Sequence, residues 1–323
     1  MLQLGIAGVG GLGQLHLKNY LKRRDVQVIA LATRTGKITT GQTNLNEAGQ
    51  SLVPAGAIVH AGYEKVCDDP RLDVVSINLP TDLHAPAAIR ALENGKHVFC
   101  EKPIARHPAE AHRMLAAAKA SGKLLMIGHC LRFFPEYVAA DKIIRSGQYG
   151  KVLGASFARS GGMPTWGSEL WFIKPARSGG AVIDLHIHDV DVALWWWGAP
   201  AKIEATGISP YLIYSRWHYA HGPVVQFECA WDPVPKSPFY YSFKIILEHA
   251  TLLYDTRINL GLQLATATAL EPVPLDKTSG YEQEDNYFLD AVVNGGNLDR
   301  CLPAAGALAL EYATETARQL PVH

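Results

Sequence analysis

Residues 2–20 of the chain read LQLGIAGVGGLGQLHLKNY. The apolar run at residues 2–7 predicts a strand, and residues 12–23 have the composition of a helix. Between them Gly8, Gly10 and Gly13 follow the spacing G-x-G-x-x-G, which in this strand–turn–helix context is typical of a turn that holds a dinucleotide. A plain glycine turn with no ligand is the alternative interpretation.

Each glycine of this turn has its own expected role. Gly8 permits a tight turn, Gly10 lets the backbone approach a pyrophosphate, and Gly13 lets the helix pack closely on the strand. The helix N-terminus adds free N–H groups and a partial positive charge, both of which favour phosphate. The expected pyrophosphate-binding residues are Gly8, Gly10, Gly11, Leu12 and Gly13.

The first 127 residues alternate short apolar runs with helical stretches, which is typical of βαβ units and a parallel, doubly wound sheet. The expected strands are residues 2–7, 26–32, 74–79, 97–100 and 124–127. The expected helices are residues 12–23, 85–93 and 109–120. We therefore predict a nucleotide-binding domain over residues 1–127.

The pattern changes over residues 128–323. Strands are expected at residues 152–159, 202–208, 224–230, 239–247 and 251–254, and helices at residues 136–145, 187–197, 282–293 and 304–319. A run of strands with few helices predicts a mostly antiparallel sheet. We therefore predict a second α/β domain over these residues.

Composition excludes several classes of partner. Lys and Arg total 30, as do Asp and Glu, so charge gives no reason to expect nucleic acid or an anionic membrane. The sequence shows no apolar stretch long enough for a membrane span, and no signal peptide. The five cysteines are scattered, without a Cys-x-x-Cys pair, which favours free thiols in a reducing compartment. We expect a cytoplasmic protein.

The end of the second strand bears on which cofactor is bound. An acid that binds the adenosine ribose of NAD is expected about 20 residues beyond the glycine turn. This place holds Thr33, Arg34 and Thr35 instead, with no carboxylate. These side chains could bind a 2′-phosphate, so NADP(H) is favoured and NAD(H) stays possible. The alternative is that Arg34 is a solvated loop residue.

Three further motifs carry a family resemblance. Residues 76–84 read SINLPTDLH, residues 95–105 read GKHVFCEKPIA, and residues 179–191 read GGAVIDLHIHDVD. Together with the glycine turn, and with GHCLRFFP at residues 128–135, they resemble the Gfo/Idh/MocA family of oxidoreductases, which includes glucose–fructose oxidoreductase and inositol dehydrogenase. The Glu-Lys-Pro and Asp-x-x-x-His elements in this order are specific, whereas the glycine turn alone is not.

This resemblance implies a Rossmann domain and a second α/β domain with an open, predominantly antiparallel sheet. It implies an active site between the domains, and homodimers or homotetramers formed through that sheet. The substrate would be a sugar, polyol or derivative. The further cofactor-binding residues that the resemblance implies are Leu79, Pro80, Thr81, His84, Glu101 and Lys102.

Lys102 follows a strand and precedes Pro103, which fixes φ and makes a rigid turn. Because such folds bind ligands at the carboxyl ends of parallel strands, its ammonium could hold a substrate oxygen and stabilise alkoxide character. An exposed lysine without a role is the alternative. Glu101 is expected to support this turn electrostatically rather than to take part in the chemistry.

Asp184 and His188 are four residues apart and would share one face if their segment were helical. The resemblance implies that His188 is the acid–base group and that Asp184 binds substrate beside it. His186 suits a core histidine that donates to a backbone carbonyl. Asp184, His186, His188, Asp189 and Asp191 could instead hold a metal ion, which is a rival interpretation that we do not favour.

Aromatic rings pack well on the C–H faces of sugars, and Trp166 and Trp171 precede the second-domain motif. Ordinary packing is equally compatible with them. Arg132 is a further candidate. The expected substrate-binding residues are Lys102, Arg132, Trp166, Trp171, Asp184 and His188. The hypothesis is a reversible alcohol–ketone oxidoreductase, with a non-catalytic dinucleotide-binding regulator as the rival from another class.

Overall fold

The computed structural model describes residues 1–38, 53–165, 168–208 and 210–321. The chain forms two compact units, and each draws on several stretches of sequence. The first contains Met1–Cys130, Trp166–Ser178 and Tyr281–Leu310, and the second contains Leu131–Thr165, Gly179–Gly280 and Glu311–His323. The predicted boundary between a nucleotide-binding domain over residues 1–127 and a second α/β domain over residues 128–323 stays a prediction.

The first unit contains a six-stranded parallel sheet in the order β3-β2-β1-β4-β5-β6. Its strands are β1 (Leu2–Ala7), β2 (Val26–Thr33), β3 (Ile58–Ala61), β4 (Val74–Ile77), β5 (His97–Glu101) and β6 (Leu125–Gly128). All residues of β4 and β6 are buried, because helices cover both faces of the sheet. This strand order is that of the Rossmann fold, and its direction of winding reverses between β1 and β4.

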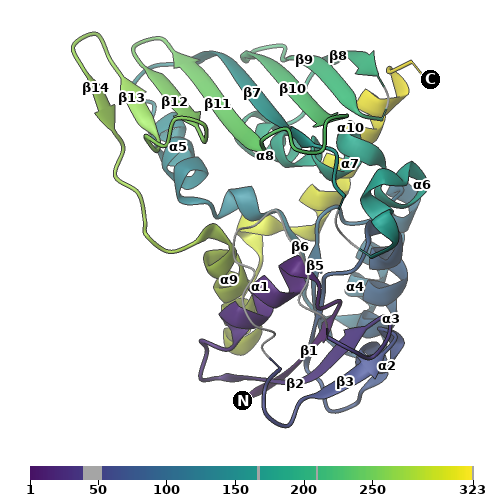
Figure 1. Ribbon diagram of the computed structural model, residues 1–323. Coiled ribbons are helices and arrows are strands. Elements are labelled where there is room, and N and C mark those ends of the chain that lie inside the picture. Colours follow the sequence, from purple (N-terminus) through teal and green to yellow (C-terminus); the bar gives the residue numbers. More distant parts are fainter. Residues whose placement is uncertain (39–52, 166–167, 209, 322–323) are drawn as a thin grey trace. The chain divides into compact units, whose positions relative to one another are not determined.

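The helices of this unit lie on the two faces of the parallel sheet. Figure 1 shows α1 and α9 on one face and α2, α3 and α4 on the other. Their bounds are α1 (Gly11–Tyr20), α2 (Glu64–Asp68), α3 (His84–Glu93), α4 (Pro108–Ser121) and α9 (Gly280–Asn294). The segment from residue 168 to residue 178 adds two short helical pieces, η3 (Ser168–Ile173) and α6 (Pro175–Ser178). Remaining 3-10 turns are η1 (Thr81–Leu83), η2 (Cys130–Arg132) and η4 (Asp299–Cys301).

The second unit contains an eight-stranded sheet in the order β14-β13-β12-β11-β7-β10-β9-β8. Its strands are β7 (Val152–Gly162), β8 (Lys202–Ile208), β9 (Leu212–His218), β10 (Val224–Asp232), β11 (Tyr240–Leu247), β12 (Thr251–Asp255), β13 (Gln263–Ala265) and β14 (Leu270–Pro272). Six of the seven pairings are antiparallel, and only β10 with β7 is parallel. The predicted α/β class, with one parallel sheet and one mostly antiparallel sheet, is confirmed.

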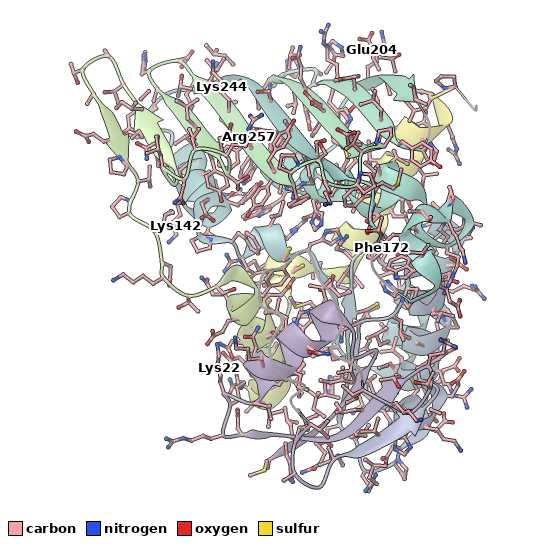
Figure 2. The ribbon with its side chains drawn as sticks, viewed as in Figure 1. Lys22, Lys142, Phe172, Glu204, Lys244 and Arg257 are labelled. Carbon is pink, nitrogen blue, oxygen red and sulfur yellow. The ribbon has the colours of Figure 1, made fainter. Side chains whose placement is uncertain are left out.

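One face of this second sheet is buried against helices and the other is open (Figure 1). The covering helices are α5 (Pro135–Ser146), α7 (Gly180–Asp184), α8 (Ile187–Trp197) and the later part of α10 (Pro303–Arg318). Aromatic side chains fill the space between them, and the rings are Tyr137, Phe157, Trp196, Trp217, Phe227 and Phe243. Figure 2 marks Lys244 on β11 and Glu204 on β8, which belong to the open face.

None of the helices that the structure describes combines the length and the apolar character that a membrane crossing requires.

Candidate functional site

The glycine turn joins β1 to α1 with little room for side chains. Gly8 has φ of +93°, and a Cβ added there would lie 2.4 Å from the carbonyl oxygen of Asn78. A Cβ on Gly13 would lie 2.0 Å from the carbonyl oxygen of Gly8, so the helix touches the turn backbone. Gly10 differs, because its Cβ would meet nothing within 4 Å. Gly8 and Gly13 therefore shape the turn, and Gly10 leaves open space in front of it.

The open space in front of Gly10 lies at the N-terminus of α1. Gly10 is the N-cap of α1 and offers no side chain to the first N–H groups of that helix. Such N–H groups and the helix dipole form an anion site. The turn, including Gly11 and Leu12, thus fits the pyrophosphate of a dinucleotide.

At the end of β2, Thr33 donates its hydroxyl to the carbonyl of Lys37 at 3.1 Å. Arg34 is exposed, and its Nε lies 3.7 Å from a carboxylate oxygen of Glu169 in η3. Glu169 also lies 3.4 Å from Arg177, which pairs with Asp82 at 2.8 Å. Arg34 is therefore free of strong restraint, since exposed ion pairs of this kind contribute little. Thr35 is exposed beside it.

The loops after β4 and β5 are joined by a buried histidine. The two ring nitrogens of His84 lie 2.7 Å from the carbonyl oxygen of Pro103 and 2.8 Å from that of Leu79. His84 thus holds together the two loops that were predicted to bind cofactor. Thr81, the first residue of η1, is buried, and its hydroxyl oxygen has no hydrogen-bond partner in the described part of the chain.

Lys102 lies in the turn after β5, half-buried, with a cis peptide bond to Pro103. Its backbone N–H donates to the carboxylate of the preceding residue, Glu101, at 3.1 Å. The Glu101 side chain is buried and its other oxygen lies 3.0 Å from Nε2 of His16 in α1. Glu101 therefore links this turn to α1 through its two carboxylate oxygens, and its electrostatic support of the turn stays a prediction.

In the second unit, Asp184 and His188 do not share one helix. α7 ends at Asp184, and α8 begins at Ile187 after a break at Leu185. Leu185 and His186 between the two helices keep right-handed helical backbone angles, and the N–H of His186 bonds to the carbonyl of Ala181 five residues earlier, so the helix is irregular here. That both side chains project from one helical face stays a prediction. Every residue from 178 to 194 is buried except His188, which is half-buried, so solvent reaches this histidine among buried neighbours.

Two buried ion pairs hold this region. Arg132 makes two hydrogen bonds to Asp191, both at 2.8 Å, and Arg159 makes two to Asp189, both at 2.9 Å. Burial alone would lower the pKa of Arg159, but the charge of Asp189 outweighs it and raises that pKa. Because arginines occupy both carboxylates, neither is well placed for a cation. Within the described ranges the structure shows no group of three or more metal-ligating side chains.

His186 differs from its predicted role. Its side chain is fully buried and its ring packs edge-on against Phe227, with centroids 5.2 Å apart. Neither ring nitrogen has a hydrogen-bond partner among the described residues, so the predicted bond to a backbone carbonyl is not formed. Burial, together with the charge of Arg159, lowers the pKa of His186 to about 3, which keeps the ring neutral.

The structure describes one of the two tryptophans that were predicted to bind substrate. Trp166 lies outside the described residues. Trp171 is half-buried and stacks on Phe172, with ring centroids 3.9 Å apart, in the segment that belongs to the first unit. Figure 2 marks Phe172.

Two family profiles match the chain. Residues 2–129 match an oxidoreductase family with an NAD-binding Rossmann fold, and residues 137–252 match the GFO/IDH/MocA C-terminal domain. Among characterised relatives, the chain is 32% identical over 211 residues to scyllo-inositol 2-dehydrogenase (NAD(+)) of Bacillus subtilis. The aligned region covers 64% of this chain and 56% of that protein. D-glucoside 3-dehydrogenase of Escherichia coli is 31% identical over 210 residues, covering 62% of this chain and 55% of the relative.

The chain therefore spans about half the length of the curated relatives it matches. Among solved structures, levoglucosan dehydrogenase in complex with NADH and levoglucosan superposes with a TM-score of 0.81 at 23% identity. That superposition covers 98% of this chain and 97% of the other. At this identity the likeness establishes a common fold.

Proposed function

From the premise that the chain belongs to the Gfo/Idh/MocA family of oxidoreductases, we propose that it transfers a hydride between a nicotinamide cofactor and a CH–OH or keto carbon of a sugar, polyol or derivative. One observation carries the proposal. The glycine turn, the Leu79–Thr81 loop and the Lys102 turn follow β1, β4 and β5, which are adjacent strands of one parallel sheet. Ligands of such sheets bind at the carboxyl ends of the strands where the winding reverses, here between β1 and β4.

The proposed chemistry divides among three side chains. A bound nicotinamide would supply or accept the hydride. The Lys102 ammonium holds the substrate oxygen and stabilises the negative charge that grows on it. His188 takes the hydroxyl proton in oxidation and returns it in reduction, a task suited to a partly exposed imidazole. Asp184 anchors a neighbouring hydroxyl, and the remaining proposed substrate-binding residues are Arg132, Trp166 and Trp171.

An absorbance assay at 340 nm tests this function with NAD⁺ and NADP⁺ over a panel of cyclitols, aldoses and glycosides. We expect at least one polyhydroxylated compound to give cofactor reduction that depends on the protein concentration. Reduced cofactor that binds tightly, with no turnover of any panel member in either direction, would support the non-catalytic regulator instead.

We propose that NADP(H) is favoured and NAD(H) is accepted. Arg34 would pair with the 2′-phosphate, and no carboxylate of β2 stands in the way. Arg34→Ala should raise the KM for NADP⁺ about 10- to 100-fold and change the KM for NAD⁺ less than about threefold, since one charged hydrogen bond is worth about 1.5–3 kcal/mol. Steady-state kinetics with both cofactors measure this difference.

Glu169→Gln is the companion variant with the opposite expected effect, because it removes the carboxylate that lies 3.7 Å from Arg34 and keeps the side-chain shape. This variant should lower the KM for NADP⁺ several-fold, since a carboxylate near a 2′-phosphate repels it. If Arg34→Ala weakens both cofactors equally, the guanidinium contacts the shared adenosine instead, and the preference for NADP(H) is wrong.

We also propose a homodimer or homotetramer that forms through the open face of the second sheet. Four apolar side chains on its outward-facing positions are exposed by 39–49%: Ile208, Tyr214, Val224 and Ile246. Exposed apolar groups gathered on one sheet face are typical of an interface.

A further inference from the structure

A buried histidine of α1 connects the dinucleotide turn to the Lys102 turn. His16 has no exposed surface. Its Nδ1 lies 2.7 Å from a carboxylate oxygen of Asp285 in α9, and its Nε2 lies 3.0 Å from a carboxylate oxygen of Glu101 at the end of β5. These three residues, His16, Glu101 and Asp285, form what we call the His16 bridge, and all of them belong to the first unit.

The chemistry of the bridge fixes its protons. An ionised carboxylate only accepts hydrogen bonds, so both ring nitrogens of His16 must donate, and the ring must carry a positive charge. Burial by itself lowers the pKa of His16, but the charge and hydrogen bond of Asp285 and the hydrogen bond of Glu101 outweigh it and raise that pKa well above the usual range. One cation between two carboxylates leaves the bridge with a net charge of −1.

Three aromatic rings pack around His16, and none of them carries a positive charge. Tyr20 of α1 and Tyr281 of α9 face His16 with ring centroids 6.1 and 6.2 Å away, and Phe99 of β5 lies 5.0 Å away. Burial raises the pKa of Tyr20, so that phenol stays neutral. Asn19 donates to the second oxygen of Asp285 at 2.8 Å, which fixes the orientation of that carboxylate.

The bridge reaches Lys102 through the second oxygen of Glu101. That oxygen accepts the backbone N–H of Lys102 at 3.1 Å, while the first oxygen faces His16. We propose that His16 is a positioning residue: as an imidazolium held between Asp285 and Glu101, it fixes the orientation of the Glu101 carboxylate and thereby holds the Lys102 turn against the dinucleotide-binding helix. This inference rests on the proposed function in taking Lys102 as the catalytic group.

The protonation of His16 can be measured without any substrate. Two-bond ¹H–¹⁵N correlation spectra of protein labelled with ¹⁵N-histidine should show one ring with both nitrogens protonated from pH 6 to pH 9. Asp285→Asn keeps an acceptor for Nδ1 but removes a charge, so the same ring should lose a proton at a lower pH, which assigns the signal to His16. If the ring assigned to His16 titrates near pH 6.5 in the wild-type protein, or is neutral at pH 7, the proposal is overturned.

Kinetics then test the link to Lys102. In His16→Gln the two buried carboxylates lose the cation between them and face one another as like charges, so Glu101 is no longer held as an acceptor for the N–H of Lys102. We expect kcat at pH 7 to fall about 10- to 100-fold, the acidic limb of the kcat–pH profile to move up by about one pH unit, and the KM for substrate to change less than about threefold.

The matched control is His97→Gln, the same substitution at the opposite end of β5, where Nδ1 of the ring accepts a hydrogen bond from the N–H of Leu124 at 3.1 Å. His97→Gln should leave the pH profile unchanged. If His16→Gln and His97→Gln lower kcat equally without moving the acidic limb, His16 has only a structural role and the proposal fails. If no compound is turned over at all, the proposed function fails, while the spectra still decide the charge of the bridge. The spectra of the wild type and of Asp285→Asn also suffice if His16→Gln does not fold.

Discussion

Replacement of Lys102 by methionine is expected to lower kcat by about 10²- to 10³-fold, which is the usual loss when one donor to a developing oxyanion is removed. Methionine keeps most of the length and apolar stem of lysine and removes the charge. The Lys102 side chain is half-buried in the turn after β5, so the substitution should not disturb the fold. The measurement is kcat at saturating cofactor and substrate, together with a fluorescence titration of reduced cofactor.

The cofactor titration separates chemistry from binding. The dissociation constant of reduced cofactor should change less than about threefold, because the glycine turn and the helix N-terminus of α1 remain intact. Lys119→Met is the matched control, since Lys119 is an exposed residue near the end of α4. If Lys102→Met keeps kcat within a few-fold of the wild type, Lys102 is not the group that holds the substrate oxygen.

Five strands of the parallel sheet could be predicted from the sequence because they are mostly buried and appear as short, mainly apolar runs. β3 was not predicted, since Ile58–Ala61 is an edge strand with no fully buried residue. β9 was also missed, because its inward positions are Ile213, Ser215 and Trp217, and the serine interrupts the apolar alternation. Edge strands and polar inward positions give a weak periodic signal.

The candidate site was predictable only where its residues are close in sequence. The glycine turn and the Lys102 turn each have a local motif. The structure explains the glycines by close backbone contacts at Gly8 and Gly13, and Glu101 by its bond to the N–H of Lys102. Asp285 lies 269 residues from His16, and no local pattern pairs them. A signal was nonetheless present, since His16 lies one helical turn after Gly13, on the helix that the motif defines. Helix breaks such as the one at Leu185 have no glycine or proline to mark them.

The glycine turn allows a prediction that separates folding from binding. Gly13→Ala should reduce the free energy of unfolding by about 3 kcal/mol, because the new Cβ would lie 2.0 Å from a backbone oxygen of Gly8 that cannot move aside. Gly10→Ala should change that free energy by less than about 1 kcal/mol, since its Cβ meets nothing within 4 Å. Chemical denaturation without cofactor measures both values.

Gly10→Ala should affect cofactor affinity far more than it affects the free energy of unfolding. Gly10→Ala places a methyl group in the open space where the pyrophosphate is proposed to lie, so affinity for reduced cofactor should fall about tenfold or more in a protein that is otherwise stable. The stabilisation that cofactor gives to the folded state should fall with it, because a ligand stabilises only as far as it binds. If Gly10→Ala binds cofactor as the wild type does, the pyrophosphate does not approach the backbone at Gly10. The α1 N-terminus would then have to hold the phosphates from a different side, and the assignment of Gly11 and Leu12 would fall with that of Gly10.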